Sequence, residues 1–200
     1  IRNITKQAKA QIFTRRMCNK SISNSPEYIN NRSEVGHWKI DTVKSCASST
    51  VECALTLTER KTRAEITGKY RTLKARSVVE EINKLEASLG KETIKKLFKS
   101  ITADCGPEFM DFEGIEKLSD GTKRTELYFA HPYCACKHRT NENLNRMFRR
   151  FYPKGTDFAK LNPKLFIEVQ TWMNNYPRKI LTGSTPETEK CMGKESTIPI

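Results

Sequence analysis

The chain has 200 residues, of which 36% are hydrophobic and 30% charged, enough for one domain with a real core. It contains no apolar run of about 18 residues, so we expect no membrane span, and residues 1–20 are polar and basic, without the pattern of a signal peptide. The formal net charge of +13 favours a polyanionic partner, most commonly nucleic acid, over the alternative of a merely solubilising surface.

Residues 1–35 are predicted to be an extension or linker, because they carry seven basic and only two acidic residues and include a loop-like stretch at 21–27. A strand pattern begins at His37. Three strands are predicted, at 37–45, 50–58 and 63–70. Their short connections favour an antiparallel meander.

Helices and strands follow in alternation. Residues 75–89 show a helical apolar face, and Gly90 fits the end of that helix. The elements predicted after it are a strand at 99–104, a short helix at 108–118, a strand at 126–130, a helix from about Thr140, a helix at 163–176 and a polar tail after Pro177. This order predicts a mixed α/β sheet covered by helices.

Three carboxylates fall at informative places in this order. Asp41 lies within the first strand, Asp104 at the end of the fourth, and Glu142 in the first turn of the helix after the fifth. If the first and fourth strands are neighbours, the two aspartates can face one another. Carboxylates from separate elements can hold Mg²⁺ ions about 3.5–4 Å apart, as phosphodiester chemistry requires. The alternatives are ordinary: an acid at a helix start and aspartates that form turns.

The seven cysteines do not suggest a disulfide framework, because their number is odd and no secretory signal is present. Free thiols in a reducing cytosol are the favoured interpretation. Cys134, Cys136 and His138 form a C-x-C-x-H cluster, but its spacing is not that of a usual zinc finger and a fourth ligand is not evident, so zinc is the minor alternative.

Six segments carry distinctive residue combinations in a fixed order. They are Gly-His-Trp-Lys-Ile-Asp-Thr-Val at 36–43, Leu-Thr-Glu-Arg-Lys-Thr-Arg at 57–63, Thr-Ala-Asp-Cys-Gly-Pro-Glu-Phe at 102–109, Thr-Asn-Glu-Asn at 140–143, Phe-Tyr-Pro-Lys-Gly-Thr-Asp-Phe at 151–158, and Asn-Tyr-Pro-Arg-Lys at 175–179 with Thr-Pro at 185–186. Together they resemble the catalytic domain of bacterial insertion-sequence transposases, most closely the IS-thirty family of DDE transposases. The resemblance covers roughly residues 21–190.

The resemblance implies a ribonuclease-H-like fold, as in retroviral integrases, with three antiparallel strands and then two parallel ones in a mixed sheet flanked by helices. It also implies that Asp41, Asp104 and Glu142 are the catalytic triad and the ligands of two Mg²⁺ or Mn²⁺ ions. Thirty-seven residues separate Asp104 from Glu142, near the spacing expected of such enzymes. The implied activity is metal-dependent phosphodiester hydrolysis and strand transfer, the chemistry of DNA integration and recombination.

The implied organisation is a basic linker at 1–35, which would follow an N-terminal helix-turn-helix region not visible in this chain, an integrase-like core at 36–190 and a tail at 191–200. The implied partners are double-stranded DNA, at element ends and target, and further copies of the chain assembled on DNA in the bacterial cytoplasm, with no membrane. The residues expected to contact DNA are Arg146, Arg149, Arg150 and Lys154.

Several positions depart from the usual pattern of the family. Cys105 stands where Asn is usual, Arg139 where Gly, Lys39 where an acid, Cys136 where Trp, and His131 where an aspartate precedes the Pro-Tyr pair. The alternative function is therefore an inactive, transposase-derived DNA-binding protein. A ribonuclease of the same fold would explain the triad but not the closing motifs.

Overall fold

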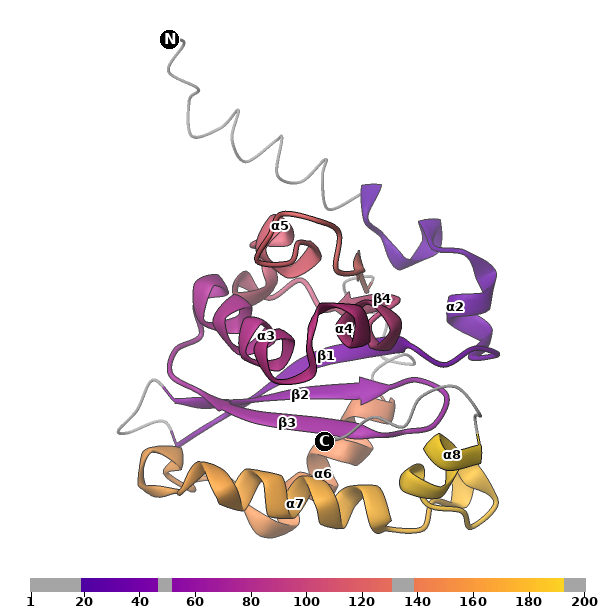
Figure 1. Ribbon diagram of the computed structural model, residues 1–200. Coiled ribbons are helices and arrows are strands. Elements are labelled where there is room, and N and C mark those ends of the chain that lie inside the picture. The colour runs from indigo at the N-terminus through magenta and orange to yellow at the C-terminus, as the bar shows by residue number, and fades with distance from the viewer. Residues whose placement is uncertain (1–18, 47–51, 131–138, 193–200) are drawn as a thin grey trace, which may run out of the picture.

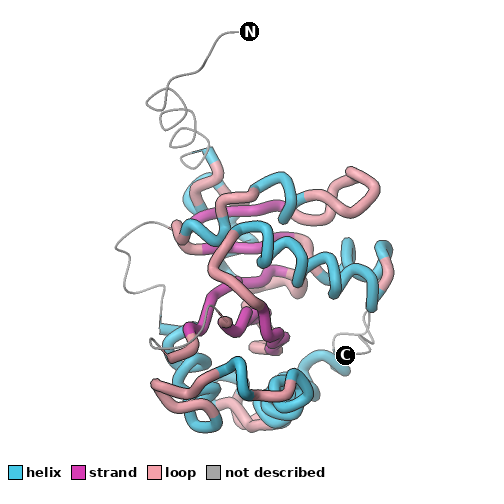
Figure 2. The backbone as a smooth tube through the Cα atoms, turned by 90° about the vertical axis from the view of Figure 1, so that its left-hand side faces the viewer, coloured by secondary structure: helices cyan, strands magenta, loops and turns pink. Residues whose placement is uncertain are grey.

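A five-stranded sheet lies between two layers of helices in the computed structural model, which describes residues 19–46, 52–130 and 139–192 (Figures 1 and 2). The strands are β1 (His37–Lys44), β2 (Cys53–Glu59), β3 (Glu65–Tyr70), β4 (Ser100–Ala103) and β5 (Glu126–Phe129). Their order in the sheet is β3-β2-β1-β4-β5, with antiparallel pairs among the first three and parallel pairs β1–β4 and β4–β5. This confirms the predicted ribonuclease-H-like sheet.

The helices of the described residues are α2 (Glu27–Asn31), α3 (Ala75–Leu89), α4 (Lys91–Leu97), α5 (Phe112–Glu116), α6 (Arg139–Phe151), α7 (Pro163–Asn175) and α8 (Pro186–Met192), with short 3₁₀ turns at Ile22–Asn24, Pro107–Phe109, Phe158–Lys160 and Lys179–Leu181. The short helix predicted at 108–118 is confirmed in part, because the helix observed there is shorter than predicted. The chain forms a 3₁₀ turn there and then α5, because the Asp111 side chain accepts a hydrogen bond from the Gly114 N–H and starts a new helix. The helices α2, α4 and α8 were not predicted.

One face of the sheet packs against α3, α4 and α5, as Figure 1 shows above the strands. Trp38 and Ile40 of β1 point into this core, and the Trp38 indole N–H donates to the Leu97 carbonyl oxygen at 2.7 Å. Because side chains alternate along a strand, Lys39 and Asp41 project from the opposite face. A buried core on one face thus presents the polar residues of β1 to the other.

That other face is covered by α6 and α7, which lie below the strands in Figure 1. Val43 and Ala54 of the sheet pack against Met147 and Phe148 of α6 and Phe166 of α7. Burying an aromatic or large aliphatic side chain contributes about 1.5–3 kcal/mol, so this second core holds α6 firmly against β1. The position of α6 matters because it carries Glu142.

The edge strand β3 is also bound by α7. The Asn174 side chain accepts from the Glu65 N–H at 2.8 Å and donates to the Glu65 carbonyl oxygen at 2.9 Å. One turn earlier, the Gln170 side-chain oxygen accepts from the Thr67 N–H at 2.7 Å. These bonds satisfy backbone groups that an exposed edge strand would otherwise leave open for pairing.

The described part of the predicted linker, residues 19–35, packs beside β5. The Phe129 N–H of β5 donates to the Lys20 carbonyl oxygen at 2.7 Å, and Ile22 and Ile29 are buried. These residues therefore contribute to the packed core, although the sequence predicted a linker.

Several sequence features fall outside the described residues: Cys18, His131, Cys134, Cys136 and His138. In the described part of the chain, Cys46, Cys53 and Cys105 are thiols rather than disulfides. No helix there is both long and apolar enough to cross a membrane.

Candidate active site

The parallel pairing of β1 with β4 brings the two aspartates to the same level. Lys39 of β1 pairs with Thr102 of β4. Continuing this register by two residues places Asp41 level with Asp104, with both side chains on the face that α6 covers. The expectation that these strands are neighbours is confirmed.

The Asp41 carboxylate is held from two directions. Its Oδ1 accepts the Thr42 N–H at 2.8 Å, and its Oδ2 accepts a hydrogen bond from Asn145 Nδ2 at 3.0 Å. Asn145 lies on α6 three residues after Glu142, so the two side chains share one side of the helix. Asn145 was not predicted as a site residue, although its i+3 spacing from Glu142 was a signal for it.

The Asp104 carboxylate is held by the turn that follows β4. The Gly106 N–H donates to Asp104 Oδ1 at 2.9 Å. A Cβ atom on Gly106 would lie 2.9 Å from this oxygen and 2.6 Å from Glu108 Oε2, so a larger residue there would push these carboxylates aside. Glu108 in turn accepts a hydrogen bond from the Thr42 hydroxyl at 3.1 Å and links the turn to β1. Glu108 lies within the motif at 102–109 but was not predicted to be a site residue.

Glu142 is exposed in the first turn of α6. Within the described ranges, no three His, Cys, Asp or Glu side chains are grouped closely enough to hold a metal ion. The donor set itself suits Mg²⁺, which prefers carboxylate oxygens. Ligation of one ion by Asp41, Asp104 and Glu142 together would therefore require these three side chains to come closer to one another. Their catalytic and metal-binding roles stay a prediction.

Lys39 is a second residue of this face to which the sequence analysis gave no role in the site. Burial is the main cause that lowers the pKa of its ammonium group. The carboxylates of Asp41, Asp104 and Glu142 all act in the opposite sense. A positive charge therefore lies within electrostatic reach of the three predicted metal ligands and offsets part of their negative charge.

The four predicted DNA-binding residues differ in their surroundings. Arg146, Arg150 and Lys154 are exposed. Arg149 is half-buried: its Nη2 donates to the Lys44 carbonyl oxygen at 2.7 Å, its Nη1 reaches carbonyl oxygens just after α6, and burial lowers its pKa. These contacts fasten the end of α6 to the end of β1. DNA binding by the four residues stays a prediction.

A fourth carboxyl group, that of Glu65, is buried at the start of β3, where α7 packs against this strand. It is 1% exposed, and burial raises its pKa to about 8. The Thr58 hydroxyl donates to its Oε1 at 2.6 Å, while Oε2 has no hydrogen-bond partner in the described residues. At neutral pH this group is therefore mainly protonated and adds little negative charge near Asp41.

Comparison with known proteins decides the family, although no protein-family model matches the chain. The chain is 38% identical over 179 residues to the "probable transposase for insertion-like sequence element IS1161" of Streptococcus salivarius. The aligned region covers 88% of this chain and 48% of the relative. It is 33% identical over 162 residues to the transposase InsI of IS30A from Escherichia coli, covering 80% and 39%. The chain belongs to the IS30 family of insertion-sequence transposases.

This IS30-family chain spans about half the length, or less, of the curated relatives it matches. A further relative, the transposase of IS4351 from Bacteroides fragilis, is 30% identical over 169 residues, with 82% of this chain and 47% of the relative covered. Among solved structures, a simian T-cell lymphotropic virus intasome in complex with a PP2A regulatory subunit matches with a TM-score of 0.56 and 13% identity, covering 82% of this chain and 56% of the intasome chain. At that identity the likeness shows the fold alone, an integrase-like core.

Proposed function

We propose that this chain is the catalytic core of a DNA transposase that uses Mg²⁺ or Mn²⁺, as two ions, held by Asp41, Asp104 and Glu142. The observation that best supports this proposal is the parallel β1–β4 pair, whose register sets the two aspartates level on the face that α6 covers. The transposase relatives support the class of reaction. Duplex DNA as substrate, assembly of several copies on DNA and a bacterial cytoplasmic location belong to the same proposal.

The proposed chemistry has two steps at phosphorus. In the first, a water oxygen bonds to the phosphorus at the end of the element, the bond to the 3′ oxygen breaks, and a 3′-hydroxyl is left. In the second, that hydroxyl oxygen bonds to a target phosphorus while the target's own 3′ oxygen leaves. When bound, the divalent ions would polarise the phosphate and favour the deprotonated nucleophile.

The chain's own residues supply orientation and charge in this scheme. Asn145 holds one oxygen of Asp41, and the Gly106 N–H holds one of Asp104, so each carboxylate keeps a defined direction. Exposed cations on and after α6, including Arg146, would contact the phosphates of the DNA backbone. We assign the core to residues 36–190 together with 19–35, which pack beside β5, and 191–200 to a tail.

The alternative of an inactive DNA-binding protein has one specific observation in its favour. The Lys39 ammonium acts on all three carboxylates, at a position where the family resemblance implies an acid. A fixed positive charge there lowers the attraction of the site for divalent cations. The substitution Lys39→Glu distinguishes an active transposase core from an inactive DNA-binding protein. A large gain in Mn²⁺ affinity and DNA cleavage in Lys39→Glu would show that Lys39 impairs metal binding and catalysis in the wild-type chain.

The test uses DNA that flanks the coding sequence, because the ends of the element lie there. Mn²⁺ binding is measured by electron paramagnetic resonance, and cleavage and strand transfer are measured on labelled DNA. Asp41→Asn, Asp104→Asn and Glu142→Gln each remove one negative charge at nearly constant size. We expect each to abolish cleavage while DNA affinity stays within about twofold, because binding depends on phosphate contacts elsewhere.

Glu113→Gln is the matched control, because Glu113 is an exposed carboxylate on α5, on the opposite side of the sheet. It should leave both cleavage and Mn²⁺ binding unchanged. If the wild-type chain binds DNA but neither binds Mn²⁺ nor cleaves, the alternative function holds. If Glu142→Gln keeps wild-type strand transfer, Glu142 has been misassigned.

A further inference from the structure

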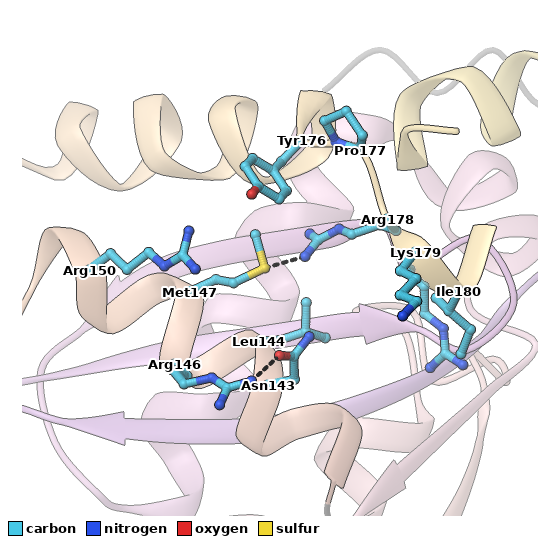
Figure 3. A pocket seen from close by; sticks show the side chains of 11 residues that line it. Asn143, Leu144, Arg146, Met147, Arg150, Tyr176, Pro177, Arg178, Lys179 and Ile180 are labelled. Carbon is cyan, nitrogen blue, oxygen red and sulfur yellow. Dashed lines mark hydrogen bonds between the residues drawn. The ribbon is translucent and has the colours of Figure 1, made fainter. Parts of the chain in front are cut away.

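A pocket of about 420 Å³ opens between α6 and the turn that follows α7 (Figure 3). Residues 143–150 of α6 form one wall and residues 176–180 form the other. The pocket begins at Asn143, the residue after Glu142, so it lies along the helix that carries this predicted site residue. None of the described residues that line it is acidic.

The polar lining is strongly cationic and comes from Arg63, Arg146, Arg150, Arg178 and Lys179. Arg63 and Arg178 are 5% and 6% exposed. Burial lowers the pKa of both, that of Arg63 to about 10, so both remain charged at neutral pH. Arg63 also has a backbone φ of 64°, a conformation that costs energy in a residue other than glycine.

Arg178 forms no ion pair within the described residues. Its Nη2 donates to the Met173 carbonyl oxygen at 2.8 Å, its Nη1 reaches the Met147 sulfur, as Figure 3 shows, and its Nε has no hydrogen-bond partner in the described part of the chain. The Glu65 carboxyl acts electrostatically on Arg178, but burial raises its pKa to about 8, so it is mainly protonated at neutral pH. A buried cation without an ion pair is costly. An anion in the pocket would supply the opposite charge.

The remaining lining is apolar and includes Leu144, Met147, Tyr176, Pro177 and Ile180. Tyr176 is exposed, and Ile180 is 64% exposed. The Arg150 guanidinium carbon lies 6.0 Å from the centre of the Tyr176 ring. The pocket therefore joins an aromatic and aliphatic wall to a cationic one, which is the combination that a base and its phosphate require.

We propose that this pocket binds one unpaired nucleotide of the DNA strand beside the reacting phosphate. The inference rests on the proposed function, which makes DNA the substrate. The volume lies in the range of small-ligand pockets, about 300–1,000 Å³, and suits a single nucleotide. A base can enter such a pocket only after it has left the duplex stack. The base would lie against Tyr176 and Ile180, and its phosphate would bind Arg150 and Lys179.

The test compares two DNA probes in EDTA at fixed salt: a paired duplex and the same duplex with one unpaired 2-aminopurine nucleotide. Affinity and 2-aminopurine fluorescence are measured for the wild-type chain and for Arg150→Gln and Ile180→Ser, both at exposed positions where folding tolerates change. We expect wild type to prefer the unpaired probe by about tenfold, the scale of one base stack, and to quench its fluorescence.

Both pocket variants should lose this preference, and Arg76→Gln should keep it. Arg76 is the matched charge control, because it is exposed on α3, across the sheet. Equal wild-type affinity for the two probes would overturn the inference, as would equal losses on both probes in Arg150→Gln. Because no metal is present, these outcomes do not depend on cleavage. A chain that keeps the preference but never cleaves refutes only the proposed function.

Discussion

Replacing Glu65 by glutamine removes a carboxyl group that burial keeps protonated at neutral pH. Burial raises the pKa of Glu65 from 4.5 to about 8, against the opposing effects of the Thr58 hydroxyl and the Arg178 charge. Between these two pH values the folded chain holds a proton that the unfolded chain has released. The contribution of this group to stability is therefore complete below about pH 4.5 and is lost as the pH rises to about 8.

The size of this effect follows from the two pKa values. The difference between 4.5 and about 8 corresponds to about 5 kcal/mol of free energy of unfolding. Relaxation and water entry reduce such penalties in real proteins, so we expect about 2–4 kcal/mol. Glutamine keeps the oxygen that accepts the Thr58 hydrogen bond and cannot ionise. Glu65→Gln should therefore match wild type near pH 5 and be more stable than wild type by about 2–4 kcal/mol near pH 8.5.

The assay is urea unfolding in EDTA at about pH 5, 7 and 8.5, followed by the fluorescence of Trp38 and Trp172. The deciding quantity is the difference in free energy of unfolding between Glu65→Gln and wild type at each pH, because all other titrating groups are present in both proteins. Glu92→Gln is the control, because it removes a carboxylate whose side chain is 83% exposed. If the stability curves of Glu65→Gln and wild type run parallel across this range, the reasoning about Glu65 is refuted.

Three further substitutions test other contacts. Arg149→Ala should lower the free energy of unfolding by about 2–3 kcal/mol in urea titrations, because the bond from its guanidinium to the end of β1 is lost. Gly106→Ala should leave the chain folded by circular dichroism but slow DNA cleavage by about 10²-fold, because a Cβ atom would displace the Asp104 carboxylate. Arg124→Ala should cost about 3–5 kcal/mol in thermal unfolding, because Glu86 would be left as a buried, unpaired charge.

The first two of these expectations have a matched comparison variant, and the third has a threshold. Arg150→Ala removes an exposed arginine from the same helix, and a loss of stability equal to that of Arg149→Ala would contradict the anchoring role. Gly68→Ala adds a Cβ atom in β3 with only an ordinary contact, and it should leave cleavage unchanged; equal slowing by Gly68→Ala and Gly106→Ala would refute the steric argument. The expectation for Arg124→Ala fails if this substitution lowers the free energy of unfolding by no more than about 1 kcal/mol, the value of an exposed ion pair.

Local periodicity was enough to predict most of the fold. The helix predicted at 75–89 is α3 (Ala75–Leu89), and the strand predicted at 37–45 is β1 (His37–Lys44). Both are long segments with regular apolar spacing, which local pattern describes well. The short helices α2, α4 and α8 were missed, because elements of one or two turns carry little periodicity and depend on tertiary packing. The motifs also led to the family and to the three candidate carboxylates.

The tertiary structure decided which side chains meet. Asn145 donates to Asp41 across 104 positions of sequence, and Arg149 donates to the Lys44 carbonyl across 105. In the second contact, the Arg149 side chain binds the backbone at the end of β1, whereas the sequence predicted that Arg149 contacts DNA. The pocket likewise joins Arg63 to residues of α6 and of the segment after α7. Local sequence determines where a helix or strand forms and which of its faces is apolar, but the partner of a polar side chain depends on how those elements pack, and that is a property of the whole fold.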